Sequence, residues 1–171
     1  MLSTLSRSAR SRRAPGGLLC GALVGAAAGA AGTTALNATT YLDMVLRARP
    51  ASSTPEETMQ RLSDLSHVPI PGGQEERQNR LTGLGALTGL VAGVAAGGLL
   101  GMVRAGGWRP QPAVGVLAAT TVALLVGNVP MTVSGVTDPR TWSARDWAAD
   151  AVPHAAYGVV TSAILNRLDP S

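Results

Sequence analysis

The sequence contains no phenylalanine and no lysine, and aromatic residues make up only 3% of its 171 positions. A soluble domain of this length normally fills its core with bulky aromatic side chains, so their scarcity argues against an ordinary soluble core. The apolar mass comes instead from alanine, leucine and valine, accompanied by 21 glycines. Small side chains at this density suit helices that pack closely in lipid.

Cysteine is also scarce, because Cys20 is the single one in the chain. One cysteine excludes an intramolecular disulfide framework and any CxxC redox or zinc motif. The sequence has no HExxH motif, nucleophile elbow or phosphate-binding glycine loop, so we expect no enzyme activity, cofactor or metal site. All 14 basic residues are arginine, but no basic stripe alternates with aromatic residues, and we expect no nucleic-acid partner.

Long uncharged stretches dominate the remainder of the chain. Crossing ~30 Å of hydrocarbon takes about 20 apolar residues in a helix. We therefore predict an all-α fold, a polytopic membrane protein built as a four-helix transmembrane bundle with glycine-zipper packing. A basic cytoplasmic tail at residues 1–15 precedes a single transmembrane domain at residues 16–171. The expected spans cover about residues 16–42, 81–103, 112–135 and 148–167.

The first apolar segment has a second interpretation. Its basic tail and the alanine-rich residues 26–31 resemble a signal peptide followed by a small-residue cleavage site. Apolar character continues through Ala35, Leu36 and Ala38, well past that site. This continuation favours an uncleaved membrane anchor, and the signal peptide stays open as the alternative.

Residues 44–80 form the longest polar connection. Residues 54–57, with the sequence Thr-Pro-Glu-Glu, resemble a capping box with proline at the first helical position. Apolar residues follow with a spacing near one helical face. We therefore predict a short amphipathic helix over about residues 55–66, lying on the membrane or on the bundle, and another helix that begins near Gln74.

Small side chains recur every four residues in three of the apolar segments. Residues four apart share one face of a helix, and a row of glycines there lets another backbone approach closely. We expect the first two segments to pack on each other or on a partner subunit through these rows. The rows are Gly17, Gly21, Gly25 and Gly29 in the first segment, Gly85, Gly89, Gly93, Gly97 and Gly101 in the second, and Gly115, Ala119, Ala123 and Gly127 in the third.

The orientation depends on arginines near the ends of the spans. Seven arginines fall on each side of a four-span protein, but the first tail is purely basic and the first segment usually dominates. We therefore expect both termini in the cytoplasm. Trp108 then lies at the inner interface, with Trp142 and Trp147 at the outer one.

Polar residues inside the spans are the first place to look for function. Asp150, His154, Tyr157 and Thr161 share one stripe of the fourth segment, where Pro153 also lies. They can form a pocket near the outer leaflet in which His154 accepts a proton, or they can merely satisfy helix ends. We favour the second interpretation. The candidate polar cluster comprises Asn37, Asp43, Asn128, Asp150, His154 and Tyr157.

Two short stretches carry a family resemblance. They are Asn37-Ala38-Thr39-Thr40-Tyr41-Leu42-Asp43, followed by Arg47, Arg49 and Pro50, and His154-Ala155-Ala156-Tyr157-Gly158. Together they resemble small four-helix integral membrane proteins of actinobacterial type. The resemblance implies a membrane location and no particular activity, and it assigns no role to any residue.

These observations lead to a non-enzymatic membrane protein that acts through assembly. It would be a homo-oligomer in the lipid bilayer or an accessory subunit of a membrane partner. The alternative is a small oligomeric transporter or proton-coupled channel that uses Asp150 and His154. A membrane hydrolase built on the same two residues ranks last, because the chain offers no nucleophile beside them.

Overall fold

A computed structural model of the protein describes residues 15–168, so most of the expected basic tail lies outside the described residues. The described residues are all-α. They form five α-helices and one short 3-10 helix: α1 (Pro15–Arg47), α2 (Thr54–Ser66), α3 (Gln74–Ala105), α4 (Pro112–Val133), η1 (Pro139–Thr141) and α5 (Ala144–Leu168).

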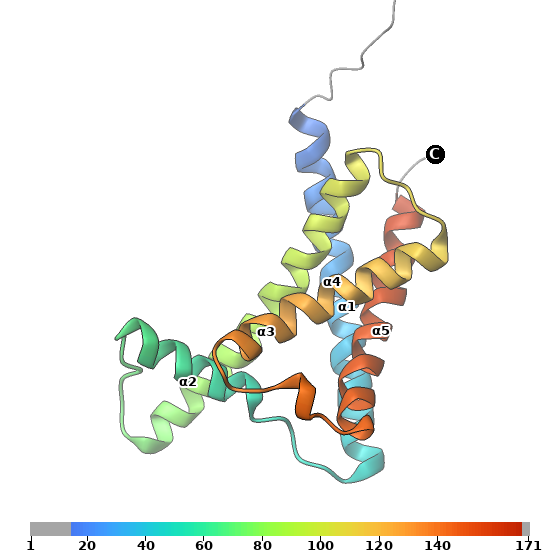
Figure 1. Ribbon diagram of the computed structural model, residues 1–171. Helices are drawn as coiled ribbons and strands as arrows, with labels where there is room; N and C mark the ends of the chain where they lie inside the picture. The colour runs from blue at the N-terminus through green and yellow to red at the C-terminus, as the bar shows by residue number, and fades with distance from the viewer. Residues whose placement is uncertain (1–14, 169–171) are drawn as a thin grey trace, which may run out of the picture.

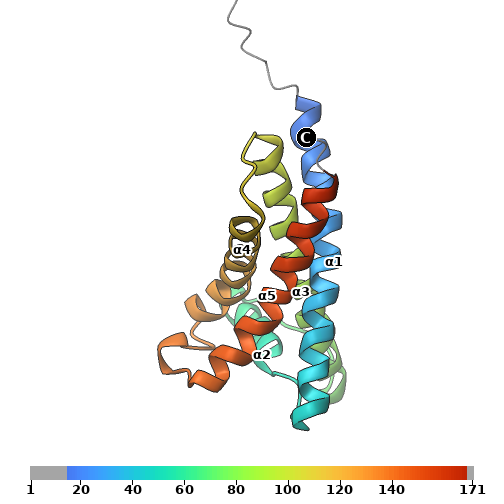
Figure 2. The same cartoon turned by 90° about the vertical axis from the view of Figure 1, so that its right-hand side faces the viewer.

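The four long helices alternate in direction (Figures 1 and 2). The start of α1, the connection from α3 to α4 and the end of α5 lie at one end of the molecule. The end of α1 and η1 lie at the other end, and α2 lies beside the first turns of α3. The described ends of the chain, at α1 and α5, are therefore on the same side.

Three helices are long and apolar enough to cross a membrane, judged by length and composition: α1, α3 and α4. This finding indicates a membrane protein. The fourth expected span falls on the 25-residue α5, which does not belong to this group. Asp146, Asp150 and His154 lower its apolar character.

Glycines bring α1 and α3 into backbone contact. A Cβ added to Gly25 or Gly97 would lie closer than 3.0 Å to backbone atoms of the other helix. The same holds for Gly21 and Gly101, one turn along each helix. Because no side chain larger than hydrogen fits there, the two backbones pack directly against each other along these turns.

Three glycines of the predicted rows take no part in this contact. An added Cβ at Gly17 or at Gly89 would meet nothing within 4 Å. Gly85 lies against Pro55 of α2, not against α1. The four-residue spacing fixes which face a residue lies on, but it does not fix where two helices diverge. Along α3, the contact with α1 runs from Gly93 to Gly101 and does not extend back to Gly89.

Two further long helices, α5 and α4, pack around this pair. α5 lies along α1, with Leu165 in one buried cluster that also contains Ala28 and Ala119. α4 covers α5 through its row of small residues, of which Gly115, Ala119 and Ala123 are buried. The outer faces carry many exposed leucines and valines, as the surface of a helix in lipid would.

Local signals explain several helix boundaries. Ser143 and Asp146 form reciprocal bonds at the start of α5, since Ser143 N donates to Asp146 Oδ2 (3.0 Å) and Asp146 N donates to Ser143 Oγ (3.3 Å). The turn after α3 uses Gly107 with φ of 101°. At α2, however, the cap residue is Ser53, and it makes no side-chain cap bond to the backbone. The expected capping box is therefore not formed there.

Candidate functional site

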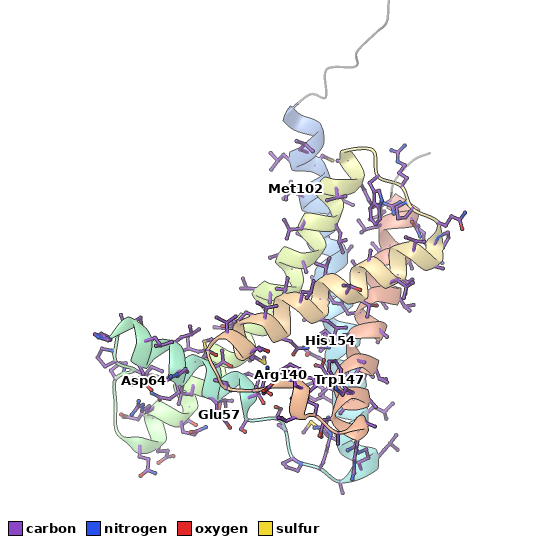
Figure 3. All side chains as sticks on the ribbon, in the orientation of Figure 1. Glu57, Asp64, Met102, Arg140, Trp147 and His154 are labelled. Atoms are coloured by element: carbon purple, nitrogen blue, oxygen red, sulfur yellow. The ribbon has the colours of Figure 1, made fainter. Side chains whose placement is uncertain are left out.

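Asn128, Asp150 and His154 lie together between α4 and α5. Asn128 Nδ2 donates to Asp150 Oδ2 over 2.8 Å, which joins the two helices. His154 Nδ1 lies 2.7 Å from the carbonyl oxygen of Asp150 and 3.4 Å from its Oδ1. Figure 3 shows His154 within the α5 part of the bundle, away from the ends of the helix.

The local sequence places these groups at an interruption in both helices. Pro130 lies inside α4 and Pro153 inside α5. A proline inside a helix has no N–H to give to the carbonyl four residues earlier, here those of Val126 and Ala149. The cluster therefore lies where each helix has one backbone bond fewer, which concentrates polar groups in an otherwise apolar contact.

The hydrogen bond to Asp150 O determines which ring nitrogen of His154 carries the proton. A carbonyl oxygen only accepts, so His154 Nδ1 carries the proton that is donated to Asp150 O. Nε2 is then the basic nitrogen, and it lies 3.4 Å from a Cβ added at Gly127. The side chains of His154 and Asp150 are 15% and 19% exposed, so this nitrogen is largely shielded.

The other members of the predicted cluster do not join it. Asn37 is exposed on α1. Asp43 pairs with Arg47 (3.3 Å) and Arg49 (2.5 Å) at the end of α1. Asn37 and Asp43 both lie near the end of α1 where we expected them, but on other faces of the helix. The rotation of α1 about its axis is set by its glycine contact with α3. The structure therefore does not bring all six residues into one polar pocket, which was the interpretation that we did not favour.

Tyr157 also points elsewhere, although it shares a stripe with His154. It is fully buried, and its hydroxyl donates to the carbonyl oxygen of Gly93 in α3 over 2.7 Å. Thr161 Oγ1 donates to Ala28 O in α1 over 3.4 Å. The C-terminal part of the stripe, with Tyr157 and Thr161, therefore joins α5 to α1 and α3, whereas His154 faces α4.

Two glycines that sequence reasoning missed make this packing feasible. A Cβ added to Gly32 of α1 would lie closer than 3.0 Å to Thr161 Oγ1 and to the ring of Tyr157. One added to Gly158 of α5 would lie 2.8 Å from Val116 O in α4. Both glycines fall outside the four-residue rows. The only signal in the sequence was their position inside apolar segments.

The described residues contain no group of three or more histidine, cysteine, aspartate or glutamate side chains that could hold a metal ion. A small cavity of about 10 Å³ lies at the other end of α5, bordered by Ser162, Gly115 and Trp108. It has room for about one water molecule. It does not reach the polar cluster.

Comparison with known proteins adds no assignment, since no family model, curated protein or solved structure matches the chain.

Proposed function

We propose that the protein is an integral membrane protein with a structural or accessory role and no catalytic activity. In this proposal α1, α3, α4 and α5 form a four-helix transmembrane bundle with glycine-zipper packing. The observation that carries it is the backbone contact at Gly25, Gly97 and Gly101, which leaves no room between α1 and α3 for a ligand or a pore. Helices packed in this way make a rigid anchor.

The contacts of the glycine rows indicate which surfaces remain for an oligomer or a membrane partner. Gly21 to Gly29 of α1 and Gly93 to Gly101 of α3 are used within one chain. A homo-oligomer or a membrane partner would therefore bind to outer surfaces. In the most apolar part of α4 only 11% of the residues are buried within the protein, against 28% in α1 and α3, so α4 offers the most free surface.

The assembly can be tested with a matched pair of variants on one helix. Gly97→Leu places a large side chain at the α1–α3 contact, while Gly89→Leu adds the same side chain where the helix is open. We expect the parent and Gly89→Leu to migrate as a complex larger than a monomer on native gels of membrane extracts. Gly97→Leu should lose that complex, because it distorts the bundle whose outer surfaces the complex uses.

A strictly monomeric parent chain, shown by photobleaching of labelled protein in native membranes, would contradict the proposed assembly. Survival of the complex in Gly97→Leu would show that the glycine contact does not support it.

A second candidate function is proton-coupled transport through the cluster of Asn128, Asp150 and His154. The hydrogen bond that links Asp150 to α4 favours it, because protonation there would alter a contact between two helices. We expect His154→Ala to abolish proton flux in proteoliposomes. His67→Ala is the control, since His67 is exposed in a loop. Flux that is absent in the parent, or equal in both variants, removes this candidate.

A further inference from the structure

A groove of about 610 Å³ lies where α2 packs on the beginning of α3. Small-molecule sites occupy roughly 300–1,000 Å³, so the groove has the size of a binding site. Its walls come from α2, from the first turns of α3 and from Val136 after α4. Both signs of charge line it: Glu56, Glu57 and Asp64 are acidic, and Arg61 and Arg77 are basic.

Hydrogen bonds from α2 show which turns of α3 lie beside the groove. Arg77 Nη2 donates to Gln60 Oε1 over 2.7 Å, in the charged first turns of α3. Thr82 Oγ1 donates to Glu56 Oε1 over 2.6 Å, just inside the uncharged stretch that starts at Leu81. α2 therefore crosses the point at which α3 passes from a polar to an apolar sequence.

The length of α3 also places the groove near the edge of the hydrocarbon core. α3 has 32 residues, about 48 Å at 1.5 Å per residue, whereas the hydrocarbon core is ~30 Å thick. The surplus lies at the charged beginning of α3, where α2 is bound. α4 ends at Val133, three residues before Val136 in the wall of the groove. Two candidate spans thus end beside the groove, which places it at the height of lipid headgroups.

The basic side chains keep donors for a ligand. Arg61 is exposed and donates through Nε to Ser134 O (3.3 Å), so its two terminal nitrogens are not used in that bond. Arg77 uses Nη2, and its Nε is buried without a hydrogen-bond partner among residues 15–168. A guanidinium is well suited to bind a phosphate group.

The acidic side chains supply the opposite charge. Glu57 accepts from Ser53 Oγ through Oε1 (2.5 Å), and Asp64 accepts from Gln60 Nε2 through Oδ1 (2.7 Å). Each bond uses one carboxylate oxygen. Figure 3 shows both acids on α2, in the part of the molecule that projects from the bundle. The groove therefore offers acceptors for an ammonium group beside donors for a phosphate.

We propose that this groove binds the headgroup of a zwitterionic phospholipid. Arg61 and Arg77 hold the phosphate, and Glu57 and Asp64 hold the ammonium group. A purely anionic headgroup fits less well, since three carboxylates would face it. Leu84 follows Leu81 on the same face of α3 and is 41% exposed, which gives the acyl chains an apolar path. The inference rests on the proposed membrane location.

Native mass spectrometry of the full chain in mild detergent tests the site. Phosphatidylethanolamine and phosphatidylglycerol with identical acyl chains are added separately. We expect phosphatidylethanolamine to be retained more strongly. The double variant Arg61→Gln, Arg77→Gln should weaken its retention by about tenfold or more, the loss expected when charge-assisted hydrogen bonds are removed.

The matched control is Arg140→Gln, Arg145→Gln, which removes the same charge from η1 and the start of α5 and should leave retention unchanged. Because Arg77 also bonds Gln60 and Arg61 also bonds Ser134 O, circular dichroism of each single variant checks that a loss does not come from misfolding. Glu57→Gln, Asp64→Asn should reduce the preference for phosphatidylethanolamine over phosphatidylglycerol.

Equal retention by the parent and the Arg61 and Arg77 variants would overturn the site. Stronger retention of phosphatidylglycerol by the parent would overturn its zwitterionic character. Both outcomes leave the membrane location intact. Release of the protein from membranes by an alkaline carbonate wash would instead refute the membrane location itself.

Discussion

Tyr157 shows how a single residue joins three helices of this protein. It belongs to α5, its hydroxyl donates to Gly93 O in α3, and its ring lies against Gly32 in α1. A ring of this size fits because both neighbours lack a side chain. In a chain without phenylalanine, Tyr157 is the largest fully buried side chain among residues 15–168, followed by Thr161 and Ser162.

Tyr157→Phe should reduce the free energy of unfolding in detergent by about 0.5–1.5 kcal/mol, because it removes one hydrogen bond and keeps the ring. Unfolding by a denaturing detergent, followed by circular dichroism, measures this. Tyr41→Phe is the control, since Tyr41 is 61% exposed, and it should change the unfolding free energy by less than about 0.5 kcal/mol. Equal effects of the two substitutions would contradict the assigned role of the hydroxyl.

The sequence predicted which residues share a stripe with Tyr157, but not which helix each of them faces. Asp150, His154, Tyr157 and Thr161 do lie on one side of α5, as their spacing indicated. The contacts nevertheless divide among α4, α3 and α1. Spacing along one helix carries no information on the crossing of its neighbours, which depends on small residues such as Gly32.

At the scale of helices, α4 is attached to the bundle mainly through one face. Its buried residues are the small ones of its four-residue row, and they lie toward α5. The bond from Asn128 to Asp150 is a polar link between the two helices. Since small residues bury little apolar area, this link should contribute a large share of what holds the C-terminal half of α4.

Asn128→Ala should lower the unfolding free energy by about 1–3 kcal/mol, because the carboxylate of Asp150 loses a donor in a mostly buried place. Hydrogen exchange should accelerate in the C-terminal half of α4 and remain unchanged in α1. Asn37→Ala serves as the comparison, since Asn37 is exposed. Uniform exchange across all helices in Asn128→Ala would argue that the bond does not hold α4 specifically.

Helix boundaries were more predictable than helix contacts. The amphipathic stretch expected at residues 55–66 is covered by α2, and α3 begins at Gln74. Ser143 and Asp146, three residues apart, form the cap of α5. These features depend on neighbours in the sequence, which a single chain reveals. The open position of Gly89 and the contact of Gly85 with Pro55 depend on where α1 and α3 diverge, which no local pattern encodes.

For the whole molecule, the central question is whether α5 crosses the membrane as a fourth helix. It contains no stretch as apolar as those of α1, α3 and α4. It nevertheless packs along α1, and its end lies at the same end of the molecule as the α3–α4 connection (Figures 1 and 2). A helix buried between two spans needs less apolar surface than one facing lipid, since protein covers its polar side. Four spans would place both ends of the chain on one side.

Cysteine labelling in sealed cells tests this most directly. In a Cys20→Ser background, single cysteines replace four exposed residues: Ser53, Gln111, Ser143 and Asn166. Each variant is treated with a membrane-impermeant maleimide. Four spans with both termini in the cytoplasm predict labelling at Ser53 and Ser143, and none at Gln111 and Asn166. Labelling of Asn166 together with Ser143 would contradict the account, because α5 would then not cross the membrane.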